Sequence, residues 1–553
     1  MDRSNQRGIG RSKAGADFLQ LRPEEAPPGG LAEWLANELR TAIADGRLTI
    51  GSRLPATRQL AAELQVSRGV VTEAYQRLTE DGHTTARGRA GTTVVATPIS
   101  TAAAAGERGV GSAGAVGARG IGTTGAVGMR GVGAAGARGV GPVGAHSARG
   151  GGGAGSRGAR AGERGVAPAS STRRRAGALP GDPGDEIFEA MRAVPARFDL
   201  TPGVPDLAAF PRAAWLKAER AVLSEMSASA FGYGDAAGAP ALRLAVANWI
   251  ARNRGIKADP ADLIIVAGVS QALALICQVL GSEGITELAV EDPGSLGSRQ
   301  HLQIWGMRTP PVPVDDGGLR VDVLRETGAP AVLITPAHQF PTGVVLDGER
   351  RRELMQWAID GGLIIEDDYD AEHRYDRPPV PAVRAMLAEQ VIYTGSVSKI
   401  LAPALRIGWM LPPPRYRDQL IAAKRHADLG NAGLPQLTLA HLMESGDLER
   451  QLRFVRRRHR TRRDAMITAI ETHLPTATVH GAAAGLHLTI TFPDNLDDIA
   501  LATAALALGV KTQPLSWHTQ HPSPPGLVLC YAARTPAEIT TAITLIATAL
   551  TQT

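Results

Sequence analysis

A glycine- and arginine-rich segment limits what this chain can fold into. Residues 98–180 are mostly Gly, Ala, Val and Arg in loose repeats, with arginines recurring eleven positions apart. Since the segment offers almost no large apolar side chain to bury, we expect a flexible linker between two separately folded parts. Its eleven arginines and two acids fit a soluble spacer, and non-specific affinity for DNA is the alternative.

The remaining composition narrows the class of protein. At 553 residues the chain is too long for one domain, because a single hydrophobic core rarely grows past roughly 250–300 residues. It has no apolar run of about 18 residues, and its basic N-terminal end lacks the apolar stretch of a secretory signal. The two cysteines make neither a disulfide framework nor a metal cluster. We therefore expect a cytoplasmic protein without a metal site, and its net charge of +5 permits nucleic-acid binding.

The segment 31–97 has the pattern of a winged helix-turn-helix. It follows a tail, residues 1–30, whose Gly, Pro and charge content predicts disorder. Helical apolar spacing, an N-cap at Ser67 and glycines at the helix ends predict three helices, which two short β-prone runs follow. The expected elements are 31–45, 57–64 and 68–81, then 84–87 and 92–96. Three helices and a small hairpin in this order form a DNA-binding module.

The polar residues of this module suit duplex DNA. Ser67 and Arg68 stand at the start of the third helix, which in such proteins meets base edges in the major groove. Arg58 opens the second helix, where it could grip a phosphate, and Arg87 and Arg89 flank the hairpin tip. Each arginine alone would be a solvated charge. The stretches LPATRQLAAEL, VSR and RGRAGT, in this order, resemble the GntR-type winged helix, which implies double-stranded DNA as a partner.

From residue 181 to 553 the sequence alternates apolar β-rich runs with helical stretches. Runs that are apolar on both faces suit the buried strands of a mostly parallel sheet. The expected strands are 263–266, 288–290, 331–335, 363–365, 391–393 and 407–410. Helices are expected at 350–360, 416–427, 435–445 and 448–474, before an α+β tail at 480–553. The expected class is α/β, with a smaller C-terminal α+β domain from about 415 to 553.

The ends of these strands carry residues that suit a phosphorylated pyridine. Ligands of α/β sheets bind at the carboxyl ends of strands. EDDY at 366–369 offers a carboxylate that can keep a pyridine nitrogen protonated, and a phenol for a ring hydroxyl. AGVSQ at 267–271 opens a helix, whose first amides form a phosphate site. Each strand end alone is better explained as a turn, so the inference depends on their combination.

The stretch YTGSVSKILAPALRIGWM, residues 393–410, presents Lys399 and then Arg406. A lysine that forms a Schiff base must lose its proton, which burial and local positive potential favour. Hydroxyls at Ser396 and Ser398 and the guanidinium would suit a phosphate beside it. A surface lysine in a polar loop is the alternative, and the strand ends favour a pyridoxal phosphate site.

Several stretches together resemble the fold-type I aminotransferases, and the order of the two units resembles the MocR (GabR-like) transcription regulators. The stretches are FGYGDAAGAPALRLAVANW, GVSQAL, VEDPG, TPAHQFPTG, IIEDDYDAEHRYD and YTGSVSKILAPALRIGWM. The resemblance implies a homodimer with pyridoxal 5'-phosphate as an aldimine on Lys399, Asp367 at the pyridine nitrogen and Tyr369 at the ring oxygen. It assigns the phosphate to Ser396, Ser398, Arg406 and the backbone at Ser270.

Two departures from the family concern the recognition of a substrate. Ser295 replaces a usual tyrosine, and Val528 stands where many members have an arginine for a substrate carboxylate. Arg299 and Arg534 are near in sequence, but nothing in the sequence shows that they substitute. Because efficient transamination is then doubtful, we expect a regulator that binds DNA at the nucleoid and senses an amino compound or pyridoxal phosphate itself. The alternatives are an active aminotransferase with an accessory DNA-binding unit, and a dimer scaffold.

Overall fold

The computed structural model describes residues 19, 21–44, 47–86, 91–95, 179–375, 380–493 and 495–553. The expected linker up to residue 178, most of the N-terminal tail, and Arg87 and Arg89 lie outside the described residues. Within the described part of the chain, no helix has both the length and the apolar composition that crossing a membrane requires. The two folded parts are considered separately below.

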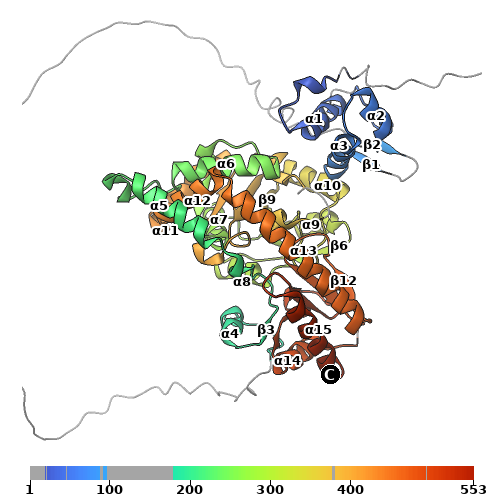
Figure 1. Ribbon diagram of the computed structural model, residues 1–553, viewed down its shortest axis with the longest axis vertical. Coiled ribbons are helices and arrows are strands. Elements are labelled where there is room, and N and C mark those ends of the chain that lie inside the picture. Colours follow the sequence, from blue (N-terminus) through green and yellow to red (C-terminus); the bar gives the residue numbers. More distant parts are fainter. Residues whose placement is uncertain are drawn as a thin grey trace, which may run out of the picture. The chain divides into compact units, whose positions relative to one another are not determined.

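The N-terminal part is the predicted winged helix-turn-helix (Figure 1). Its elements are α1 Leu31–Ala44, α2 Thr57–Glu63, α3 Arg68–Glu80, β1 Thr84–Ala86 and β2 Thr92–Val94. One apolar core holds the helices together and includes Leu39, Leu60 and Leu78, none of which is exposed. Gln65 takes a left-handed conformation (φ 53°), which makes the link between α2 and α3 tight.

The hairpin is fixed to the helices by the segment before α2. Strands β1 and β2 pair antiparallel, with Thr84 opposite Val94. The amide of Leu54 donates to the carbonyl of Thr92 at 2.9 Å, and the amide of Val94 donates to that of Ser52 at 2.9 Å. The wing therefore gains a third backbone segment, which the sequence pattern did not show.

The larger part is built on an eight-stranded sheet of order β4-β11-β10-β9-β8-β5-β6-β7 (Figure 1). The strands are β4 Ile264–Val266, β5 Ala289–Asp292, β6 Pro311–Asp315, β7 Gly318–Leu319, β8 Ala331–Ile334, β9 Leu363–Asp368, β10 Val391–Ser396 and β11 Gly408–Leu411. All six predicted runs belong to this sheet, while β6 and β7 were not predicted. Pairing is parallel from β6 through β5, β8 and β9 to β10, and antiparallel for β11 and β7.

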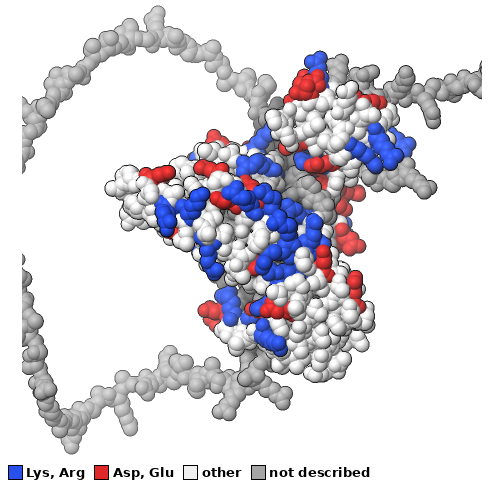
Figure 2. Space-filling view, viewed as in Figure 1, with Lys and Arg blue, Asp and Glu red and all other residues white. Residues whose placement is uncertain are grey.

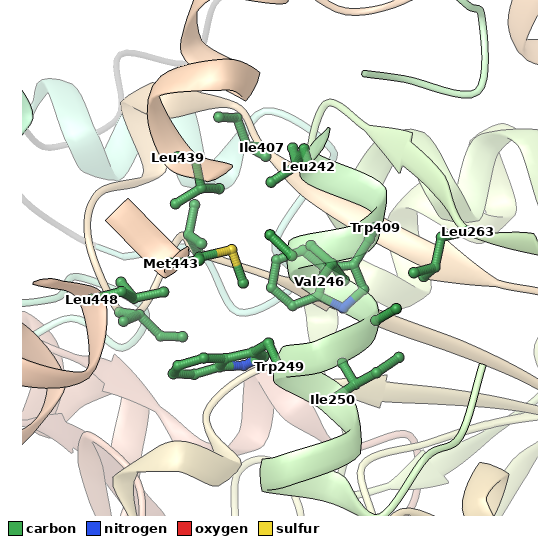
Figure 3. Close-up of a cluster of buried hydrophobic side chains, with 14 of the residues drawn as sticks. Leu242, Val246, Trp249, Ile250, Leu263, Ile407, Trp409, Leu439, Met443 and Leu448 are labelled. Atoms are coloured by element: carbon green, nitrogen blue, oxygen red, sulfur yellow. The ribbon is translucent and has the colours of Figure 1, made fainter. Parts of the chain in front are cut away.

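Helices before and between the strands cover the sheet and build its cores. They are α4 Ile187–Ala193, α5 Arg212–Glu225, α6 Pro240–Arg254, α7 Val269–Ser282, α8 Leu296–Ile304, α9 Val321–Thr327 and α10 Gly348–Ile359. Figure 3 shows one core, in which Val246 and Trp249 of α6 pack with Met443 and with Trp409 of β11. This core anchors α6 to the sheet beside the predicted lysine loop.

The C-terminal region follows the predicted order of helices and then a small α+β unit. The long helices are α11 Pro414–Asp428, α12 Gly433–Glu444 and α13 Asp447–His473. A four-stranded sheet, β12 Thr478–His480, β13 His487–Thr491, β16 Gly526–Cys530 and β15 Gln513–Pro514, follows with α14 Asp498–Ala507 and α15 Pro536–Leu550. Figure 1 shows α13 beside α15, in agreement with their contacts.

An early segment completes the C-terminal core. Strand β3 Phe198–Asp199 pairs in parallel with β14 Val510–Lys511. The next residue, Leu200, is fully buried, and its backbone bonds to Lys511 and to Cys530, each at 2.8 Å. The C-terminal unit therefore depends on residues that precede the large sheet in sequence.

We expect Leu200→Ala to lower the free energy of unfolding by about 2–5 kcal/mol, because it leaves a cavity in this core. Urea unfolding followed by circular dichroism measures the loss. Leu207→Ala is the matched control, since Leu207 is 46% exposed. Equal stability of the two variants would contradict the buried role of Leu200.

Candidate functional sites

The DNA-binding residues predicted at the starts of the second and third helices lie on the surface of the N-terminal part. Ser67 caps α3, and its hydroxyl accepts a hydrogen bond from the amide of Val70 at 3.4 Å. Arg68 is exposed, and its Nε donates to the hydroxyl of Thr57 at 3.4 Å. Arg58, in the first turn of α2, is exposed as well. The starts of α2 and α3 therefore adjoin, and they present two guanidinium groups to solvent.

Tyr75 holds this arrangement, although the sequence pattern gave it no role. Its ring is buried on α3, and its hydroxyl donates to the carbonyl of Pro55 at 2.9 Å. The segment that leads into α2 is thereby fixed against α3. In the sequence, Tyr75 belongs to an Ala-Tyr pair that resembles the GntR-type winged helix, but this pattern does not specify the hydrogen bond.

In the larger part, a cavity of about 520 Å³ opens at the carboxyl ends of the parallel strands. All seven residues predicted for the cofactor lie on its lining: Ser270, Asp367, Tyr369, Ser396, Ser398, Lys399 and Arg406. They come from the start of α7, the end of β9, and the end of β10 with the loop after it. The structure thus brings together residues that are up to 136 positions apart in the chain.

Lys399 points its amine at the backbone of a neighbouring loop. Its Nζ donates to the carbonyl of Gly203 at 2.6 Å. Burial lowers the pKa of Lys399 below its usual range, while Cys530, Asp370 and Asp367 oppose this change. A depressed pKa increases the fraction of neutral amine, which is the form that reacts with carbonyl compounds.

Asp367 supplies the acidic group of the cavity. It lies opposite Thr394 in the pairing of β9 with β10, and Thr394 donates to its carboxylate at 3.5 Å. Burial, and then the charge of Asp368, raise the pKa of Asp367 to about 7, whereas Lys399 lowers it. A cation bound beside this carboxyl would favour its ionised form, which is the behaviour that a protonated pyridine nitrogen requires.

The start of α7 and Arg406 form a site for an anion. Gly268, the residue before the helix, has φ +84°, and a Cβ there would lie 3.1 Å from both terminal nitrogens of Arg406. Arg406 itself is left-handed (φ 49°), and it donates to the carbonyl of Ala267. The amide of Ser398 donates to the hydroxyl of Ser396 at 3.3 Å. Free helix amides, a guanidinium and two hydroxyls together fit a phosphate group.

A buried polar group behind Tyr369 was missed by the sequence analysis. The Tyr369 hydroxyl lies 3.0 Å from Nδ1 of His338, and this nitrogen lies 3.0 Å from the Asp370 carboxylate. His487 packs against His338 with ring centroids 5.2 Å apart. Burial raises the pKa of Tyr369 well above its usual value, so the phenol keeps its proton. His338 lies in the TPAHQFPTG stretch, but His487, in β13, gave no local signal.

The two departures from the family pattern occupy defined places. Ser295 lines the cavity and caps α8, where its hydroxyl accepts from the amide of Ser298 at 3.2 Å. Val528 is fully buried in β16, opposite Thr489 and Gln513. Gln513 lies on the cavity lining, so the neighbouring strand offers an amide there rather than a guanidinium.

Neither of the two arginines that were considered as substitutes is on the lining of this cavity, but Arg299 lines a small adjoining pocket together with Asp367. Arg299 donates to a backbone carbonyl at 3.2 Å, and Arg534 donates to another at 3.4 Å. Among the described residues, the arginines of the lining are Arg192, which is exposed, and Arg406. A ligand carboxylate in the large cavity would therefore meet no guanidinium at Val528, while Arg299 stands beside the cavity in the small pocket that it shares with Asp367.

Comparison with known proteins accounts for both parts of the chain. Residues 31–94 match the model of the bacterial regulatory proteins of the gntR family, and residues 198–546 match that of aminotransferase class I and II. The probable rhizopine catabolism regulatory protein MocR of Rhizobium meliloti is 29% identical over 508 residues, which cover 91% of this chain and 90% of MocR. The chain belongs to the MocR family of transcription regulators.

Further relatives agree with this assignment. The pyridoxine biosynthesis transcriptional regulator PdxR of Corynebacterium glutamicum is 28% identical, over 90% of this chain and 91% of PdxR. The structure of kynurenine aminotransferase from Pyrococcus horikoshii has a TM-score of 0.61 and 26% identity, over 66% of this chain and 93% of that one. In this MocR-family chain, the cavity therefore occurs in the aminotransferase fold, and the exposed helix starts occur in the GntR domain.

The raised pKa of Asp367 predicts that the free energy of unfolding of the ligand-free protein depends on pH. Because its pKa is raised, the folded state holds a proton that the unfolded state releases from about pH 4 upward. The free energy of unfolding therefore falls as the pH rises from about 4 to about 7, and Asp367 lowers it no further at higher pH. We expect Asp367→Asn to stabilise the protein by roughly 1–3 kcal/mol at pH 8 and by less at pH 5.

Urea unfolding at the two pH values measures this difference. Asp316→Asn, at an exposed carboxylate in the β6–β7 turn, is the control and should give the same difference at both. A pH-independent effect of Asp367→Asn would show that Asp367 is ionised in the folded protein throughout this range.

Proposed function

We propose that this chain is a DNA-binding transcription regulator whose aminotransferase-like domain holds pyridoxal 5'-phosphate on Lys399 and senses a small molecule there. The observation that carries the proposal is the meeting of Lys399, Asp367 and the Gly268–Arg406 anion site on one cavity. The GntR domain supplies the DNA contact, through Arg58, Ser67 and Arg68 at the helix starts.

The residues of the cavity fit this cofactor in three places. Asp367 would face the ring nitrogen, and Tyr369, with its proton retained, would donate to the ring hydroxyl. Ser396, Ser398, Arg406 and the first amides of α7 at Ser270 would hold the phosphate. When bound, pyridoxal phosphate supplies an aldehyde that combines with amines and a ring that withdraws electrons.

The effector that the geometry supports best is pyridoxal phosphate itself. The lining provides for a phosphate and a pyridine, whereas Val528 offers no charge to a substrate carboxylate, and Arg299 and Arg534 each donate to a backbone carbonyl. The name of the relative PdxR, a pyridoxine biosynthesis regulator, is consistent with such an effector. An amino compound is the second candidate, because Lys399 would present the cofactor to any amine that enters the cavity.

We also propose a homodimer, because α5 and the segment after it expose large apolar side chains. Leu216 and Leu223 on α5 are 58% and 45% exposed, and Phe231 and Tyr233, shortly after it, are 62% and 93% exposed. A second copy that covered these residues would remove this apolar surface from water.

The phosphate site can be tested by a substitution that adds one methyl group. We expect Gly268→Ala to weaken the binding of pyridoxal phosphate at least tenfold, because the new Cβ displaces Arg406 and strains a left-handed residue. Gly281→Ala in the same helix, where nothing lies within 4 Å of the added Cβ, should leave binding unchanged. Absorbance titrations with pyridoxal phosphate and with pyridoxal measure both. Equal weakening for the two ligands would contradict a phosphate role for this site.

The proposed function predicts that the cofactor changes DNA affinity. On a duplex from a chromatin-mapped binding site, pyridoxal phosphate should shift the Kd of the wild-type protein by about 5- to 150-fold. Lys399→Ala should keep the cofactor-free affinity and lose the shift. Arg68→Ala should weaken binding about 10- to 100-fold with and without the cofactor. Borohydride treatment should attach the cofactor to the Lys399 peptide in the wild type alone.

Two results would contradict this function. An unchanged Kd with the cofactor fully bound would remove the sensing role. Rapid and complete turnover of amino donors with 2-oxo acids would indicate the alternative, an active aminotransferase with an accessory DNA-binding domain.

A further inference from the structure

Helix α13 has a composition that neither the fold nor the cavity explains. Between residues 450 and 463 it contains eight arginines and no acidic residue. Most of its apolar residues, among them Leu452, Val455 and Met466, are buried, so the helix is already packed on the domain, whereas Phe454 is 40% exposed. The arginines therefore need an explanation beyond helix formation.

Half of these arginines form ion pairs within the domain. Arg458 and Arg462 share the carboxylate of Asp206, each at 2.8 Å. Arg450 pairs with Asp447, and Arg463 pairs with Asp464. These four arginines therefore share three carboxylates, which cancel three of their four positive charges.

The other half has no carboxylate within 4.0 Å among the described residues: Arg453, Arg456, Arg457 and Arg460. Arg456 and Arg460 donate to the backbone carbonyls of Arg374 and Tyr375, contacts that orient the guanidinium groups without cancelling their charge. Arg453, Arg457 and Arg460 are exposed. Figure 2 shows the resulting band of Lys and Arg across the region that α13 occupies in Figure 1.

The three exposed arginines lie on one side of the helix. Their spacing, i, i+4 and i+7, places them on a single face over about 10 Å. Like charges at such spacings destabilise a helix, and Arg460 adds to the effect of burial in lowering the pKa of Arg456. A partner with closely spaced negative charges would offset this repulsion.

Duplex DNA is the polyanion that the chain itself brings to this surface. The GntR domain is joined covalently to the aminotransferase-like domain, so bound DNA has a high effective concentration near α13. DNA carries one charge per about 1.7 Å of its axis, and guanidinium groups bind phosphate with two parallel hydrogen bonds. A membrane surface fits less well, because an interfacial helix needs a broad exposed apolar face, and among the large apolar side chains of α13 only Phe454 is exposed, with the guanidinium of Arg458 over its ring at 5.4 Å.

We propose that Arg453, Arg457 and Arg460 form a second DNA-binding surface, on the aminotransferase-like domain, that contacts phosphates outside the site of the winged helix. The contact is independent of base sequence and of the cofactor. It would lengthen the DNA segment that one protein molecule occupies and raise the salt dependence of binding.

The test compares two triple variants of the full-length protein on a 60-base-pair duplex of mixed sequence. One variant carries Arg453→Gln, Arg457→Gln and Arg460→Gln. The control carries Arg308→Gln, Arg415→Gln and Arg425→Gln, three exposed arginines outside α13, and loses the same charge. Fluorescence anisotropy at several salt concentrations gives the slope of log K against log salt, and the cofactor absorbance reports whether each variant is folded.

Each phosphate contact adds about 0.9 to the magnitude of this slope. We expect the α13 variant to lose about 2–3 from the slope and to bind at least tenfold more weakly at 0.15 M salt, while the control stays within threefold of the wild type. Equal slopes for the two variants would overturn the proposal. It would also be overturned if the α13 variant kept its DNA slope and lost only co-sedimentation with phosphatidylglycerol vesicles.

Discussion

The parallel pairing of β9 with β10 determines where the chemistry of this protein can occur. Asp367 lies opposite Thr394 in that register, and the loop after β10 carries Lys399. Side chains alternate along a strand, so the cavity receives Asp367 while Asp368 points to the other face. A slip of one residue would turn Asp367 away from the cavity and would put a neighbouring carboxylate, Asp368 or Glu366, in its place.

The opposite face of the sheet holds this register. Nε of Arg254 donates to the Asp368 carboxylate at 2.5 Å, and the hydroxyl of Tyr393 donates to it at 2.6 Å. All three residues are almost fully buried. Both bonds end on Oδ2 of Asp368, whereas its buried Oδ1 has no hydrogen-bond partner among the described residues. Such a buried pair adds little net stability, but any register that breaks it leaves an unpaired charge in the core. We therefore interpret Arg254, at the end of α6, as the residue that holds Asp367 in the cavity.

The two surfaces proposed for DNA and the cavity proposed for the cofactor make different demands on the chain. The cavity buries its lysine and its carboxyl and so shifts the pKa of each. The DNA-binding surfaces keep guanidinium groups exposed, where they retain their charge at any physiological pH. Burial thus distinguishes the cavity, which can respond to a small molecule, from the exposed arginine surfaces, which can only bind a polyanion.

Local sequence was sufficient for elements whose signals are contained in a few residues. The three helices of the GntR domain, the six buried strands and the seven cofactor residues on the cavity lining could all be predicted, because apolar spacing, caps and strand-end motifs are short-range features. The roles of those seven residues stay predictions. So do the roles of Arg87 and Arg89, which lie outside the described residues.

Tertiary structure alone decided the contacts between distant segments. The addition of β3 to the C-terminal core, the antiparallel placement of β11 and the packing of His487 behind His338 join residues that share no local pattern. The same holds for α13, whose sequence predicted a helix but not which arginines Asp206 would neutralise. A sequence specifies which side chains are charged, whereas their free charge depends on partners that only the folded chain brings within reach.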